Sequence, residues 1–76
     1  MVSQRTAATR VLLVENEGPI RRFLVTTLES EGHEVFEAAT AVEGETLAGN
    51  RRIDVFLIDL GLPDRDGVEL IGQLRA

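Results

Sequence analysis

The sequence predicts an α/β fold with a doubly wound parallel sheet, built in the order β-α-β-α-β-α. Two short apolar runs, Val11–Val14 and Val55–Ile58, have the composition of strands that are buried on both faces, as in parallel sheets. Apolar residues at helical spacing follow each run. We therefore expect right-handed crossovers that place helices on both faces of the sheet.

Length and composition limit the possible functions. With 76 residues the chain forms at most one small domain of marginal stability, since such a chain buries only about 60% of its unfolded surface. The net charge is −5 and all eight basic residues are arginine, which argues against direct contact with nucleic acid. There is no cysteine and no long apolar run, so we expect a cytoplasmic protein without disulfides, cysteine-bound zinc or membrane contact.

The first half of the chain contains the clearer helix. We expect residues 1–9 to be a flexible tail and residues 10–76 to form the domain. Pro19 suits the first turn of a helix, and Gly32 suits its C-terminal cap. This helix is expected to turn a stripe of apolar residues toward the core: Ile20, Phe23 and Leu24.

Weaker signals define the remaining elements. Residues 33–38 (HEVFEA) predict a strand near an edge of the sheet. Thr40 and Glu43 match a capping box that opens a helix, in which Val42 and Leu47 are expected to face inward. A third helix is predicted from the spacing of its apolar residues, Val68, Ile71 and Leu74.

Acidic and amide side chains follow the first and third predicted strands. Glu15 and Asn16 come directly after the first strand, and Asp59 directly after the third. Ligands of open parallel sheets bind beyond the carboxyl ends of the strands, so these side chains converge if the strands are neighbours. Clustered oxygen ligands suit Mg²⁺. A carboxylate beside that ion can act as a nucleophile toward a phosphoryl group.

Three segments carry a family resemblance: "VLLVENE", "IRRFLVTTLESEGHEV" and "FLIDLGLPDRDGVELI". From Arg10 onward the chain resembles the receiver domain of bacterial two-component response regulators. The wording "IRRFL" and "DLGLPD" is most similar to the winged-helix transcription factors of potassium-transport (Kdp) operons. The resemblance implies a flavodoxin-like fold, of which only the first β-α-β-α-β-α portion is present.

The resemblance also implies roles for single residues. Asp59 matches the aspartate that accepts a phosphoryl group from a sensor histidine kinase. Glu15, Asn16 and the backbone carbonyl of Gly61 match the groups that hold Mg²⁺ together with Asp59. Pro63 and Gly67 match the turn that closes the loop. The resemblance therefore implies a signalling domain and not an enzyme in the usual sense. It also implies that contact with DNA is made by an effector domain outside this sequence.

Two features depart from the family pattern. The second acid of the family's metal site is Asn16 here, and an amide without charge should bind Mg²⁺ more weakly. The family's hydroxyl residue after strand four and lysine after strand five have no counterpart, and the sequence contains no lysine. A second hypothesis is therefore a phosphorylation-independent interaction or dimerisation module that acts through the exposed edge of its third strand.

Simpler interpretations exist for the same residues. Asp59 alone could cap a turn, and the acids at 15 and 17 could favour the N-terminus of the following helix. The segment 64–67 (DRDG) is similar to part of a calcium loop, but the first position of that loop would fall on Leu62, so that interpretation fails. The pair Arg21 and Arg22 is expected to lie on a solvated helix face.

Overall fold

The predicted order of elements is confirmed by a computed structural model that describes residues 8–75. Of the predicted N-terminal tail, residues 1–7 lie outside the described part of the chain. The elements follow one another as β1 (Arg10–Val14), α1 (Gly18–Ser30), β2 (Glu34–Ala38), α2 (Ala41–Asn50), β3 (Val55–Ile58) and α3 (Gly67–Leu74). In the described part of the chain, no helix has the length and apolar character needed to cross a membrane.

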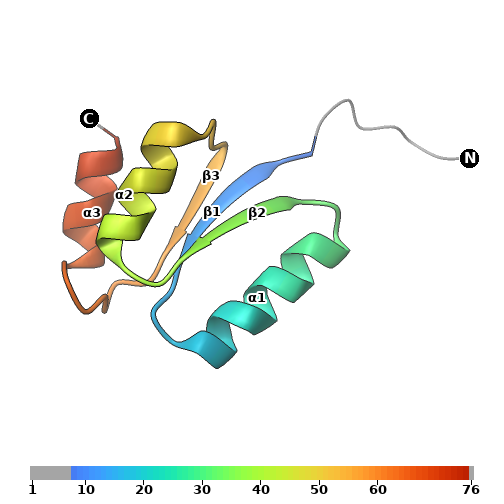
Figure 1. The fold of residues 1–76 in the computed structure, drawn as a ribbon, viewed down its shortest axis with the longest axis horizontal. Helices are drawn as coiled ribbons and strands as arrows, with labels where there is room; N and C mark the ends of the chain where they lie inside the picture. Colours follow the sequence, from blue (N-terminus) through green and yellow to red (C-terminus); the bar gives the residue numbers. More distant parts are fainter. Residues whose placement is uncertain (1–7, 76) are drawn as a thin grey trace, which may run out of the picture.

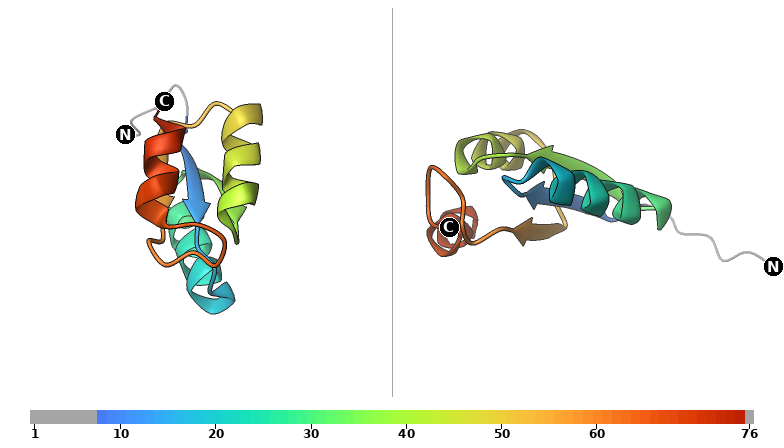
Figure 2. Two further views of the ribbon diagram at one scale, coloured as in Figure 1. Left: turned by 90° about the vertical axis from the view of Figure 1, so that its left-hand side faces the viewer. Right: turned by 90° about the horizontal axis from the view of Figure 1, so that it is seen from below.

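The three strands form a parallel sheet in the order β2-β1-β3. At the carboxyl end of the sheet, Val14 of β1 lies between Ala38 of β2 and Ile58 of β3. Helix α1 covers one face of the sheet, whereas α2 and α3 lie side by side on the other (Figures 1 and 2). Helices therefore cover both faces, as predicted.

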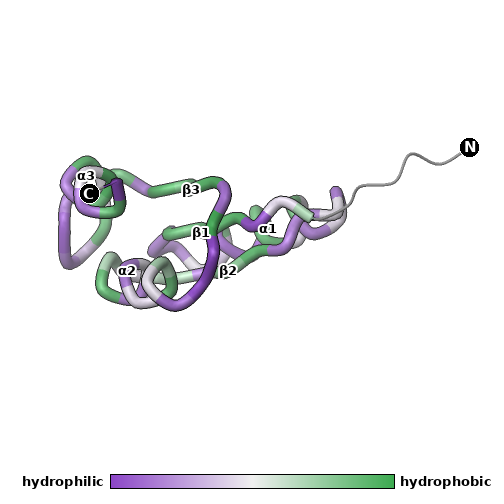
Figure 3. The backbone as a smooth tube through the Cα atoms, turned by 90° about the horizontal axis from the view of Figure 1, so that it is seen from above, coloured by the Kyte–Doolittle hydropathy of each residue, from purple (hydrophilic) through white to green (hydrophobic). Residues whose placement is uncertain are grey.

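The core is centred on β1, the middle strand. Residues 11–14 of β1 are each no more than 3% exposed, which confirms the prediction of a strand buried on both faces. Figure 3 shows β1 as a hydrophobic stretch of the chain that lies beside the hydrophobic stretch of β3. Burying one leucine of this kind contributes about 1.5–3 kcal/mol relative to an exposed position. On the side of α2 and α3, the core cluster consists of Leu12, Val14, Ala38, Ala41, Leu62 and Leu70.

Helix α1 begins and ends where the sequence predicts, but its apolar residues are less buried than predicted. Pro19 lies in its first turn, and Gly32 follows its C-terminus with a φ of 90°, which suits glycine. The expected inward stripe is wrong for two of its residues, because Ile20 and Phe23 are 45% and 67% exposed. The reason is that α1 packs against β2 and β1, so the side of the helix that carries these residues meets no other element among residues 8–75.

Helix α2 begins at its predicted cap. The hydroxyl of Thr40 accepts a hydrogen bond from the Glu43 N–H at 3.2 Å. The Glu43 carboxylate in turn accepts from the Ala39 N–H at 2.8 Å, one residue before the position of a standard capping box. Leu47 packs against the core as expected.

The inward face of α2 lies one position away from Val42. Val42 is 55% exposed, so the prediction that it faces inward is wrong; Val68, which opens the predicted third helix, is 62% exposed. The buried positions are instead Ala41 and Gly44 in α2, and Leu70 in α3. In α2, Gly44 lies against the Val14 side chain of β1, and in α3, Gly67 lies against the backbone of Asp59 and Leu60; these close contacts set the rotation of each helix.

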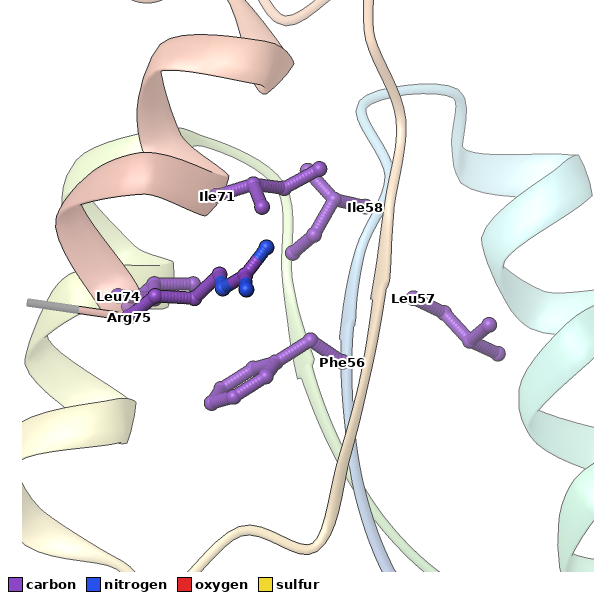
Figure 4. A pocket seen from close by; sticks show the side chains of 6 residues that line it. All are labelled: Phe56, Leu57, Ile58, Ile71, Leu74 and Arg75. Carbon is purple, nitrogen blue, oxygen red and sulfur yellow. The ribbon is translucent and has the colours of Figure 1, made fainter.

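Strand β3 is less buried than predicted. Val55, Phe56 and Leu57 are 41%, 37% and 39% exposed, so the expectation of burial on both faces is wrong for β3. The physical reason is its place at the edge of the sheet, where β1 is its only neighbouring strand among residues 8–75. Helix α3 lies beside the face of β3 that carries Phe56. Figure 4 shows Phe56 directed toward α3 and Leu57 directed toward α1. Between β3 and α3 lies an apolar pocket of about 400 Å³.

Gly67 should be the glycine least tolerant of substitution. A Cβ at this position would meet the carbonyl oxygen of Asp59 and would lie 2.6 Å from the Cα of Leu60. Backbone atoms cannot rotate away, so we expect Gly67→Ala to lower the free energy of unfolding by about 1–3 kcal/mol or more. Urea unfolding followed by circular dichroism measures this.

Gly72→Ala is the matched control in the same helix. A Cβ at Gly72 meets no atom within 4 Å, so alanine there should raise the free energy of unfolding by up to about 1 kcal/mol. Equal stability of the two variants would contradict the close approach of Gly67 to Asp59.

Candidate functional site

The candidate site lies where β1 and β3 end side by side. Val14 pairs with Ile58, and the Asp59 N–H donates to the Val14 carbonyl at 2.8 Å. Glu15 and Asp59 therefore leave the sheet next to each other. Both line a hollow of about 240 Å³ whose other walls are apolar, formed by Leu13, Leu24, Leu57 and Ile58. The structure thus brings together two of the acidic residues that the sequence singled out.

The Asp59 carboxylate is held by the turn that follows it. Its Oδ1 accepts a hydrogen bond from the Gly61 N–H at 3.0 Å. Among residues 8–75 no hydrogen bond involves its Oδ2, so one oxygen remains available to an incoming group. The bond also places the backbone of Gly61 beside Asp59, and the role of its carbonyl as a metal ligand stays a prediction.

The loop between β1 and α1 is attached to the end of β2. The Glu15 N–H donates to the Ala38 carbonyl at 3.0 Å, and the Asn16 side-chain amide donates to the Ala39 carbonyl at 3.1 Å. The amide nitrogen of Asn16 is thereby occupied, which leaves its oxygen as the atom able to bind a cation. The Glu15 carboxylate also accepts from the Glu17 N–H at 3.2 Å.

The donor set suits Mg²⁺ in chemistry. Within residues 8–75, no three side chains of His, Cys, Asp or Glu come together as a metal cluster. The available groups are the carboxylates of Glu15 and Asp59, the amide oxygen of Asn16 and the carbonyl of Gly61. All are hard oxygen ligands, and Mg²⁺ typically uses one or two carboxylates and keeps several waters. The residues fit the ion, and its binding stays a prediction.

The loop from Asp59 to Gly67 is anchored at several points. Gly61 and Asp66 form an isolated antiparallel bridge, and the Gly67 N–H donates to the Leu60 carbonyl at 3.0 Å. The Leu62 side chain is 8% exposed and belongs to the core. These contacts hold both ends of the loop, so the position of Asp59 depends on the packing of α3.

The acids of the loop cap helices. Asp66 accepts from the Val68 N–H at 2.9 Å at the start of α3. Asp64 accepts from the N–H groups of Ala41 and Val42, at 2.9 and 3.0 Å, at the start of α2. The hydrogen bond from Ala41 contributes most to lowering the pKa of the Asp64 carboxyl. Their capping roles agree with the rejection of a calcium loop.

Two contacts near the site were not expected from the sequence. One is Asp64, because no local pattern links it to a helix that begins 23 residues earlier. The other is Arg21, which was expected on a solvated face. Its guanidinium instead donates to the carbonyl oxygens of Glu15 and Asn16 at 2.8 and 3.3 Å. A basic residue in the first helical turn is the one sequence signal that could have suggested this, since it opposes the helix dipole.

The fold and the acidic end of its sheet define a class of signalling domain. Residues 11–76 match the response regulator receiver domain, and the chain belongs to that family. It is 36% identical to a CheY-like receiver domain protein from Methanospirillum hungatei JF-1, with a TM-score of 0.88 over 91% of this chain and 55% of that one. The predicted flavodoxin-like fold, with its first portion present, is confirmed.

A particular relative agrees with the resemblance to regulators of potassium-transport operons. The chain is 54% identical, over 67 residues, to the KDP operon transcriptional regulatory protein KdpE of Escherichia coli K12. It is 37% identical to the virulence transcriptional regulatory protein PhoP of Shigella flexneri. These matches cover 88% of this chain and 30% of each relative, so the chain spans less than a third of their length.

Acid should weaken the contact between Asp64 and α2. The pKa of Asp64 is lowered from its ordinary value of 3.8, so its contribution to stability is complete above that value and is lost as the pH falls through the lower folded-state pKa. We expect Asp64→Asn to be less stable than the wild type at pH 7, and this difference to shrink in acid. The measurement is the urea midpoint of both proteins at a series of pH values from 7 to below 3.8.

Glu29→Gln is the control for the Asp64 variant, because Glu29 is an exposed acid on α1. Its urea midpoints should follow those of the wild type at every pH. A difference between Asp64→Asn and the wild type that does not change with pH would contradict the assigned role of the charge.

Proposed function

We propose that this chain is the phosphoacceptor part of a response regulator, in which Asp59 receives a phosphoryl group from a sensor histidine kinase. The observation that carries the proposal is the shared hollow of Asp59 and Glu15 at the carboxyl end of the sheet. Membership of the receiver family supports it. Glu15, Asn16 and the Gly61 carbonyl are the proposed partners of Asp59 in holding Mg²⁺.

The chemistry is the transfer of a phosphoryl group from one acceptor to another. A carboxylate oxygen of Asp59 forms the new bond to phosphorus while the bond from phosphorus to the donor nitrogen breaks. Mg²⁺, when bound, offsets the negative charge that the phosphoryl group and the carboxylates bring together. The Gly61 N–H holds Oδ1 at 3.0 Å and so orients the carboxylate before transfer.

The output of the switch would lie outside this chain. The relatives KdpE and PhoP are named as transcriptional regulatory proteins, and this chain corresponds to 30% of each. We propose that phosphorylation of Asp59 acts in the cytoplasm on a DNA-binding effector in the remaining part of such a protein. A chain with a net charge of −5 is a poor ligand for DNA by itself.

Phosphorylation of Asp59 can be tested with a small phosphodonor. We expect acetyl phosphate and Mg²⁺ to add one phosphoryl group, detected by intact mass and located on Asp59 by peptide mapping. Asp59→Asn should abolish the adduct, because an amide is not a nucleophile of this kind, and chelation of Mg²⁺ should abolish it in the wild type.

The control for this test is Asp54→Asn, at the opposite end of β3. Asp54 accepts a hydrogen bond from the Arg10 N–H at 2.8 Å and lies away from the hollow. This variant should still form the adduct. An adduct that persists in Asp59→Asn, or no adduct on the wild type, would refute the proposed acceptor.

A second candidate function rests on the edge position of β3. Both faces of this strand are apolar, and Val55, Phe56 and Leu57 are 37–41% exposed. Among residues 8–75 its outer edge pairs with no other strand. Such an edge favours pairing with another chain, so the alternative is a module that self-associates independently of phosphorylation.

Sedimentation of the purified chain tests this alternative. We expect concentration-dependent dimers that Phe56→Lys weakens, because a charge on β3 opposes its burial. Val42→Lys is the matched control, since Val42 is 55% exposed on α2 and lies outside the strand edge. A monomer at every concentration would exclude the interaction module.

A further inference from the structure

Arg21 joins three parts of the candidate site. One nitrogen of its guanidinium, Nη1, donates to the carbonyl oxygens of Glu15 and Asn16 at 2.8 and 3.3 Å. Its Nε donates to the Glu37 carboxylate on β2 at 3.2 Å. The side chain is 22% exposed, so it is largely covered for an arginine on a helix surface. A single side chain thus connects α1, the β1–α1 loop and the end of β2.

Stability of the helix does not explain an arginine at this position. Arg21 lies in the first turn of α1, where its N–H makes the first bond of the helix to the Glu17 carbonyl at 2.8 Å. A positive charge there opposes the helix dipole. The Glu37 carboxylate is 53% exposed, so solvent screens the ion pair and its contribution to stability is small. The hydrogen bonds to the two loop carbonyls are therefore the contacts that can explain an arginine at this position.

The two loop carbonyls determine the backbone of Asn16. They belong to the peptide groups on either side of its Cα, and each peptide group is planar. Fixing both planes fixes the φ and ψ of Asn16, while the bond from its amide to the Ala39 carbonyl fixes the side chain. The amide oxygen is therefore held in one place before any cation arrives.

We propose that Arg21 is a positioning residue for the cation site, and that it compensates for the missing charge of Asn16 by fixing this ligand in advance. The inference rests on the proposed Mg²⁺ site. A neutral ligand gains less from electrostatic attraction than a carboxylate, so its binding depends more on prior order. Glu37 supports the same role because it holds the other side of the guanidinium.

Arg21→Lys separates geometry from charge. Lysine keeps the positive charge, which by itself repels Mg²⁺, but it is a point charge on a flexible stem and lacks the planar fork. We expect calorimetric titration with Mg²⁺ to show about a tenfold weaker affinity, the size typical of residues that orient metal ligands. Glu37→Gln should weaken binding in the same direction by a smaller factor.

The chain contains matched controls for both variants. The ion pair of Arg10 and Glu34 lies at the other end of β1 and β2 and has similar exposure, 25% and 49%. Glu34→Gln should therefore leave Mg²⁺ affinity unchanged. Arg22→Lys is the control for Arg21→Lys, since Arg22 is an exposed neighbour on the same helix.

A readout without metal keeps the two proposals distinguishable. We expect the side-chain amide signals of Asn16, observed by NMR in the absence of Mg²⁺, to shift and exchange faster in Arg21→Lys. Wild-type affinity in Arg21→Lys would overturn the inference alone. No Mg²⁺ binding by the folded wild type would refute the proposed metal site. Unchanged Asn16 signals in Arg21→Lys would then overturn the positioning role as well.

Discussion

The central place of β1 is the constraint on which the rest of this structure depends. The strand pairs with β2 on one edge and β3 on the other, and both of its faces are buried. Its last residue, Val14, is consequently adjacent to the last residues of both neighbours. The loops that leave the sheet at this end therefore lie close together, and Glu15 and Asp59 line one hollow as a result.

The position of Asp59 depends on contacts beyond its own strand. Leu62 enters the core, Asp64 caps α2, and Gly67 allows α3 to touch the backbone of Asp59. These contacts connect the candidate acceptor to two helices on the same face of the sheet. A shift in the position of Asp59 is therefore expected to move α2 and α3 before the other elements.

The acidic hollow and the exposed apolar surface are parts of one region. Leu24 of α1 and Leu57 of β3 line the hollow beside Glu15 and Asp59. Leu57 is also 39% exposed on the open side of β3. Any segment that covers these leucines would remove water from the surroundings of the carboxylates and would strengthen their electrostatic interactions. The two candidate functions are for this reason physically coupled.

The sequence by itself determined the alternating elements, the burial of the first strand and the two carboxylates of the hollow, because apolar runs and the polar residues that end them are local patterns. It did not show which strand is central, because strand order depends on contacts between distant segments. It did not predict the burial of single helix positions: Val42 is exposed, because the close contact of Gly44 with Val14 sets the rotation of α2. The roles of Arg21 and Asp64 were decided only by tertiary structure. Asp64 caps a helix 23 residues away, and Arg21 binds carbonyls whose direction depends on the packing of β1, β2 and α1. No local pattern records contacts of that kind.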